Sequence, residues 1–155
     1  MLGLDYENIR DYPSAMERTA HFERMLVQTI RGEVITQCTL IDELVTHELA
    51  RKILGDRAKN PPRSKRFRAI KAVLAESRLP LSRKLDLLRS HVKVPNHVVA
   101  SISQVNKLRN HIAHQFFLDA SQNKLKYSGK NILSVEGLRL FQRDQEEIFN
   151  YLVLR

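Results

Sequence analysis

Apolar residues recur at helical spacing in six stretches of this chain, and this periodicity constrains its fold more than any other feature. The longest stretch repeats about one apolar residue per helical turn, at Val34, Cys38, Ile41, Val45, Leu49 and Ile53. Each apolar stripe needs a neighbouring element to cover it. The sequence therefore predicts an all-α, up-and-down bundle of about five or six helices with antiparallel neighbours.

Helix boundaries follow from residues that cap or interrupt helices. Ser14 and Glu17 form a capping box, and Ser64 and Ser82 are placed to cap later helices. Gly32 interrupts the first apolar pattern, so residues 14–54 form either one long bent helix or two helices. Pro95-Asn96 introduces a helix whose apolar side consists of Val98, Ile102, Val105, Leu108 and Ile112.

The segment before the last helix is irregular. Residues 124–127 and 131–133 flank Ser128-Gly129-Lys130 and predict a small β-hairpin. A final helix is expected from about Val135. At 155 residues the chain is interpreted as a single domain, residues 1–155, with a core at about 14–153, because its breakers are too short to separate domains.

Composition and the first residues indicate a cytoplasmic protein. No run of about 18 apolar residues exists, so no membrane span is expected. The first ten residues lack the basic start and apolar core of a signal peptide. The one cysteine, Cys38, suits a reducing compartment. It falls on an apolar helical face and is interpreted as part of the core rather than as a nucleophile.

The positive charge is concentrated in one third of the chain. The net charge is +9, and residues 51–93 contain 14 Lys or Arg against three acidic residues. This asymmetry favours a polyanionic partner, RNA above all, although a solvated helical face is the alternative. Recognition by charge or shape, without base reading, is assigned to Arg57, Lys59, Arg63, Lys65, Arg66, Arg68 and Lys71.

The residues most suggestive of chemistry are in the segment Arg109-Asn110-His111-Ile112-Ala113-His114. The guanidinium of Arg109 suits phosphate oxygens, and the imidazole of His114 can exchange protons near neutral pH. On a regular helix these two residues point about 140° apart. Either the last turn loosens, or a second copy of the chain completes the site. Asn110, one turn before His114, could orient the imidazole.

This segment resembles the Arg-x(4–6)-His signature of the HEPN superfamily, in which Asn often follows the arginine. The resemblance implies a helical bundle that dimerises through the motif helices and acts as a metal-independent endoribonuclease, often a toxin with a cognate antitoxin or a defence protein. Arg109 would then stabilise charge on the scissile phosphate, His114 would be the general acid or base, and Asn110 would orient. The products would carry a 2′,3′-cyclic phosphate. No cofactor is implied.

Two alternatives to cleavage stay open. Residues 81–117 are also similar to the mannitol-operon repressor-like proteins, which implies a non-catalytic regulator or a module that binds a nucleic acid or protein partner. In the other alternative, Arg109, Asn110 and His114 serve only the fold.

No metal site is expected, because His111 and His114 lack a third ligand with suitable spacing. Asp42 and Glu48 are expected to face away from the core, although a carboxylate from their helix could reach Arg109 or His114.

Overall fold

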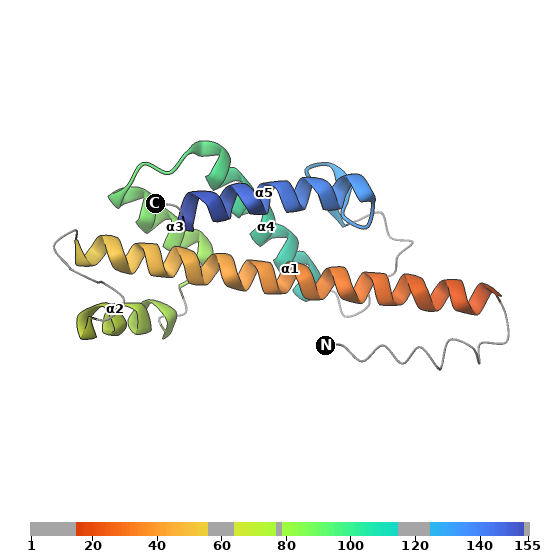
Figure 1. Ribbon diagram of the computed structural model, residues 1–155, viewed down its shortest axis with the longest axis horizontal. Coiled ribbons are helices and arrows are strands. Elements are labelled where there is room, and N and C mark those ends of the chain that lie inside the picture. The colour runs from red at the N-terminus through yellow and green to blue at the C-terminus, as the bar shows by residue number, and fades with distance from the viewer. Residues whose placement is uncertain (1–14, 56–63, 77–78, 115–124, 154–155) are drawn as a thin grey trace.

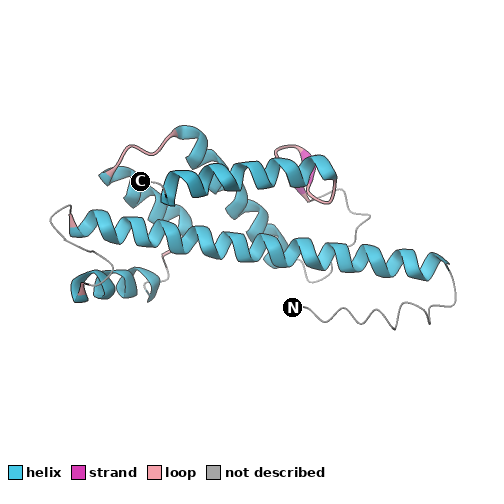
Figure 2. Cartoon of the chain, viewed as in Figure 1, coloured by secondary structure: helices cyan, strands magenta, loops and turns pink. Residues whose placement is uncertain are grey.

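The computed structural model describes residues 15–55, 64–76, 79–114 and 125–153. Its helices are α1 (Ala15–Leu54), α2 (Lys65–Glu76), α3 (Leu81–His91), α4 (Asn96–His114) and α5 (Val135–Val153). The strands β1 (Lys126–Tyr127) and β2 (Lys130–Asn131) form a hairpin before α5 (Figure 2). The predicted all-α bundle with a small hairpin is confirmed.

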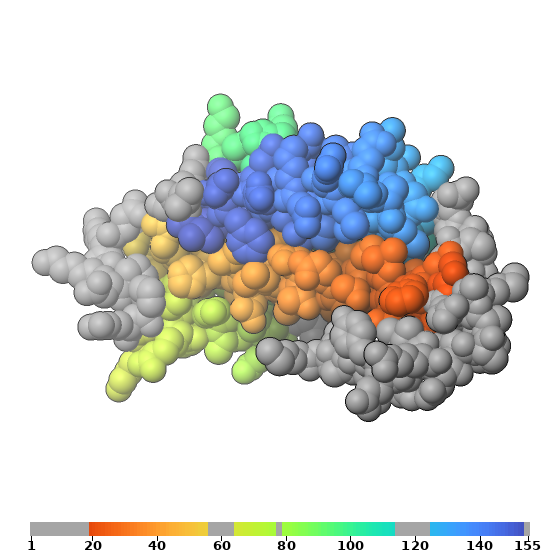
Figure 3. Space-filling view, turned by 45° about the vertical axis from the view of Figure 1, so that its right-hand side comes forward, coloured from red at the N-terminus to blue at the C-terminus, as the bar shows by residue number. Residues whose placement is uncertain are grey.

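Helix α1 spans the long axis of the molecule, and the other helices lie along it (Figure 1). Helix α5 runs beside α1 in the same direction, whereas α4 crosses back in the opposite direction. In the space-filling view, α5 lies on one side of α1 and α2 on the other (Figure 3). The alternation of direction from α3 to α4 to α5 is that of an up-and-down bundle.

The first two apolar stretches form one continuous helix of 40 residues, so the structure describes five helices. Gly32 neither ends nor interrupts α1. A glycine inside a helix costs only about 1 kcal/mol relative to alanine. Ile30 and Val34 are buried on either side of it, and their packing offsets that cost.

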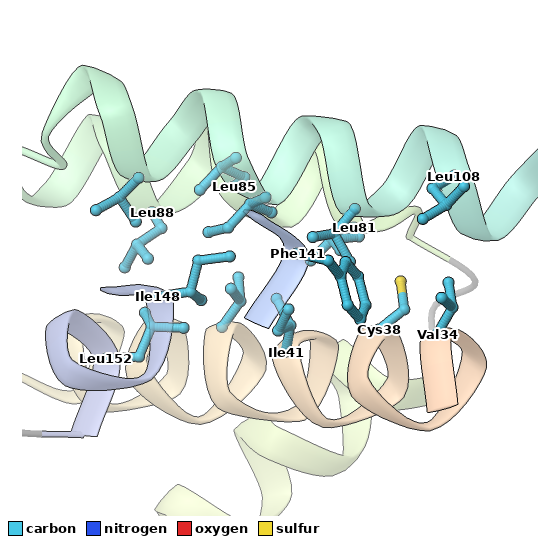
Figure 4. Close-up of a cluster of buried hydrophobic side chains, with 14 of the residues drawn as sticks. Val34, Cys38, Ile41, Leu81, Leu85, Leu88, Leu108, Phe141, Ile148 and Leu152 are labelled. Carbon is cyan, nitrogen blue, oxygen red and sulfur yellow. The ribbon is translucent and has the colours of Figure 1, made fainter. Parts of the chain in front are cut away.

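A mostly aliphatic core joins α1, α3, α4 and α5 (Figure 4), and buried side chains of α2 and of the hairpin segment complete it. Val34, Cys38 and Ile41 of α1 face α3 and α4, and Phe141 of α5 packs beside them. The burial predicted for α4 is confirmed, because its apolar side is fully enclosed: Val98, Ile102, Val105, Leu108 and Ile112.

Helical spacing assigns Phe22, Leu26 and Val73 to apolar stripes, as it does Ile53, but these residues are exposed. Phe22 and Leu26 are about half exposed, at 51% and 48%, because α1 extends past α5 at this end (Figure 1) and Val27 and Ile30 face inward instead. Ile53 and Val73 are exposed too. These residues lie at the edges of their helical stripes, where spacing alone does not separate the buried side from the exposed side.

Of the three predicted N-terminal helix caps, one is confirmed, one is wrong and one lies outside the described residues. Ser64 caps α2, because its Oγ accepts a hydrogen bond from the Phe67 N–H at 3.4 Å. The Ser82 assignment is wrong, since α3 begins at Leu81 after Pro80, whose extended backbone and carbonyl start the helix. The Ser14 side of the capping box lies outside the described residues.

The hairpin pairs Lys126 with Asn131 and Tyr127 with Lys130. Its turn is therefore Ser128-Gly129. Lys130, which we predicted to be part of the turn, belongs to β2. Both turn residues have positive φ, 49° and 81°, as a two-residue type I′ turn requires. The hairpin packs closely against α5: a Cβ added to Gly137 would lie 2.0 Å from the Asn131 carbonyl oxygen.

Candidate functional site

The Arg109–His114 segment forms the last turns of α4. Leu108 and Ile112 are buried and fix this end of the helix against the core. Arg109, Asn110 and His111 are exposed between and beside them. The predicted site residues Arg109 and Asn110 therefore lie at the surface on a rigid helix, where a ligand can reach them.

Arg109 and Asn110 line a pocket of about 360 Å³ between α1, α4 and the start of α3. We call it the Arg109 pocket. Its walls come from three elements that are distant in sequence: Cys38, Thr39 and Asp42 of α1, residues 79–81 before and at the start of α3, and Asn106, Arg109 and Asn110 of α4. The pocket combines a guanidinium, a carboxylate and two side-chain amides.

Asn110 contacts Arg109 directly. The Arg109 Nη1 donates a hydrogen bond to the Asn110 Oδ1 at 3.0 Å. This bond restrains the guanidinium at the mouth of the pocket. We predicted that Asn110 orients His114. In the structure, the Asn110 Oδ1 accepts a hydrogen bond from Arg109 and therefore orients the Arg109 side chain.

The carboxylate of this pocket, Asp42, is paired with a buried lysine of α3. The Lys84 Nζ donates to the Asp42 Oδ2 at 2.6 Å, and the two side chains are 5% and 35% exposed. A cation this deeply buried needs its partner. Sequence reasoning missed Lys84, because one lysine in a strongly basic segment gives no signal of burial.

The expectation that Glu48 faces away from the core is wrong. Asp42 is only partly exposed, and Glu48 is 7% exposed and accepts two hydrogen bonds from Arg51. Helices α2 and α3 cover α1 on additional sides, so several of its polar positions are enclosed as well. The idea that a carboxylate of this helix lies near Arg109 fits the structure, since Asp42 lines the same pocket.

Cys38 forms part of both the core and the pocket wall. Burial raises the pKa of its thiol, Arg109 lowers it, and Asp42 raises it. The net rise keeps the thiol protonated near neutral pH, as expected for a core cysteine rather than a nucleophile.

Helix α4 remains continuous to His114. On a regular helix, Arg109 and His114 lie about 140° apart around the axis. Of the two ways to bring these residues together, loosening of the last turn is not observed before His114. The other route that we predicted, a site completed by a second copy of the chain, stays a prediction.

The predicted nucleic-acid-binding residues fall into two groups. Lys65, Arg66 and Arg68 are exposed on α2, and Lys71 is partly buried. Arg57, Lys59 and Arg63 lie outside the described residues. Phe67 is buried and packs edge-on against His47, with ring centroids 4.9 Å apart, so it belongs to the core as predicted.

The described part of the chain has neither a metal-binding cluster nor a membrane-spanning helix. It contains no group of three His, Cys, Asp or Glu side chains that could hold a metal ion. None of its helices combines the length and apolar character needed to cross a bilayer. Comparisons with family models, curated proteins and solved structures found no match to this chain.

Proposed function

We propose that this chain is a cytoplasmic RNA-acting protein of the HEPN type, and that as a homodimer it cleaves RNA without a metal ion. The toxin or defence role that the resemblance implies, with a cognate antitoxin, belongs to the same proposal. One observation carries it. Arg109 is exposed, hydrogen-bonded to Asn110 and open to a pocket, rather than paired with a carboxylate inside the fold.

In this mechanism Arg109 holds a non-bridging oxygen of the scissile phosphate. The guanidinium stabilises the extra negative charge that develops as the phosphorus becomes pentavalent. The ribose 2′-oxygen loses its proton and bonds to phosphorus, and the bond from phosphorus to the 5′-oxygen breaks. His114 either accepts the 2′-hydroxyl proton, with water protonating the leaving 5′-oxygen, or protonates the 5′-oxygen, with water accepting the 2′-hydroxyl proton. The products are a 2′,3′-cyclic phosphate and a 5′-hydroxyl.

Incubation of the purified protein with mixed RNA in EDTA tests this proposal. The wild-type protein should cut RNA but not DNA, since DNA lacks the 2′-hydroxyl. Arg109→Ala and His114→Ala should each reduce the rate at least about a hundredfold. His97→Ala, an exposed histidine at the start of α4, is the matched control and should cut normally. Intact RNA under every condition would refute the nuclease.

One observation favours a second candidate, a non-catalytic regulator or binding module. The continuous α4 separates Arg109 from His114 around its axis within one chain. In that case Arg109 and the exposed basic residues of α2 bind a polyanion without cutting it. Salt-sensitive retention of intact RNA or DNA by the wild-type protein would distinguish this function from cleavage.

A further inference from the structure

A second pocket, of about 450 Å³, lies between α4 and the β1–β2 hairpin. We call it the hairpin pocket. Among the described residues that line it, two side chains are ammonium groups, Lys107 and Lys126, and none is a carboxylate. The lining consists of Gln104, Lys107, Leu108 and His111 of α4 and Lys126, Tyr127, Ser128 and Gly129 of the hairpin.

The hairpin wall of this pocket is held in place from two sides. The Ser128 Oγ donates to the Gln104 Oε1 at 2.7 Å, which ties the turn to α4. The Tyr127 hydroxyl donates to the buried Asp144 at 2.8 Å, which ties β1 to α5. The distance between the α4 and hairpin walls is therefore fixed before any ligand arrives.

The charges around the hairpin pocket favour an anion inside it. Lys107 and Lys126 are exposed ammonium groups on opposite walls, and His111 lies one turn along α4 from Lys107. The neighbouring Lys130, by contrast, is paired with Glu136 at 2.9 Å and does not line the pocket. Ammonium groups bind phosphate as point charges and accept many geometries, which suits a flexible sugar–phosphate strand.

We propose that the hairpin pocket is a second phosphate subsite, on the side of α4 away from the Arg109 pocket, and that it holds the sugar–phosphate backbone of an RNA strand. Position 114 of α4 is three residues after His111 and seven after Lys107, so it lies on the hairpin side of the helix. A strand held by Lys107 and Lys126 passes the helix end that carries His114. This inference rests on the proposed function and extends it to the path of the RNA.

Binding of a fluorescent, single-stranded RNA of mixed sequence tests the subsite. It is measured with the full chain carrying His114→Ala, which prevents cleavage. Adding Lys107→Gln and Lys126→Gln together should weaken binding about tenfold and reduce the slope of log affinity against log salt by about 1.4, or 0.7 per lost phosphate contact. Lys130→Gln is the matched control from the same hairpin. It removes one positive charge outside the pocket, as each of the two pocket substitutions removes one inside it, and should change affinity less than about twofold.

Competition identifies the ligand. Excess unlabelled RNA should displace the probe fully. Inorganic phosphate at the same total phosphate concentration should displace little of the probe, because a single phosphate ion replaces only one of the contacts that an RNA strand makes. Equal RNA affinity of the double variant and the Lys130→Gln variant would refute the subsite. A double variant that loses binding to anionic lipid vesicles but keeps its RNA affinity would refute it as well.

The two proposals can fail separately. An inactive protein whose RNA binding still depends on Lys107 and Lys126 refutes cleavage and supports the subsite. Active cleavage with unchanged RNA affinity in the double variant refutes the subsite alone. Circular dichroism of each variant confirms that the glutamine substitutions at these exposed positions leave the helices intact.

Discussion

The Arg109 pocket and the hairpin pocket lie on two sides of α4 and differ in their charges and in the contacts that hold their walls. The Arg109 pocket mixes charges of both signs and is stabilised by an ion pair whose lysine is buried. The described residues that line the hairpin pocket are basic or neutral, and the shape of this pocket depends on hydrogen bonds and on a close backbone approach behind it. The comparison teaches that one helix can present a fixed, charge-balanced site and a purely attractive surface for a polyanion.

The largest expected effect comes from Gly137→Ala. The new Cβ would lie 2.0 Å from the Asn131 carbonyl oxygen, a backbone atom that cannot move aside without shifting the hairpin. We expect a loss of about 4 kcal/mol in unfolding free energy, measured with urea. Gly32→Ala is the control, since nothing lies within 4 Å of its added Cβ. It should stabilise α1 by up to about 1 kcal/mol. Equal effects of the two variants would mean that the hairpin does not pack on α5.

The next effect should come from the ion pair on the other side of α4. Asp42→Asn leaves the Lys84 ammonium buried without a counter-charge and should cost about 3 kcal/mol. Lys84→Met should cost about 1 kcal/mol or less, because the partly exposed Asp42 can be hydrated and the methionine fills the space. Denaturant unfolding of both variants measures the asymmetry. If the lysine variant were the less stable, Lys84 would be solvated rather than buried.

A smaller effect is expected from Tyr127→Phe, and it should depend on pH. Burial and the hydrogen bond to Asp144 raise the pKa of Tyr127 well above its ordinary value. The folded chain therefore keeps this proton at pH values where the unfolded chain loses it. The contribution to stability is complete below about pH 10 and declines as the pH rises further.

Replacing this hydroxyl should cost about 1–2 kcal/mol at neutral pH, since it leaves a buried carboxylate oxygen unsatisfied. The difference between wild type and Tyr127→Phe should narrow above pH 10. Urea unfolding at neutral and alkaline pH measures both. A difference that stays constant with pH would show that the Tyr127 hydroxyl is not protected by the fold.

Features that depend on local spacing were predictable from the sequence. The apolar residues of α4 specify its buried side, and the same period places Arg109 and Asn110 at the surface. The Ser128-Gly129 turn needs positive φ at both positions, and its sequence marked the hairpin within one residue of its observed register.

Features that depend on how distant segments approach one another were not predictable. Lys84 is buried only because α3 packs on α1 opposite Asp42. Gly137 looks like any helical glycine until the carbonyl oxygen of Asn131 is placed against it. The hairpin pocket needs Lys107 and Lys126 on facing walls, and no spacing in one segment encodes that arrangement.

Subunit mixing tests the central claim most directly, namely that Arg109 and His114 act on one phosphate across two copies. Arg109→Ala and His114→Ala proteins are each inactive alone in this account. When the two are unfolded together and refolded, half of the dimers should be mixed, and each should hold one intact site. About a quarter of the wild-type RNA cleavage should then return in EDTA. A wild-type protein that cuts RNA while the mixture stays inactive would contradict a shared site.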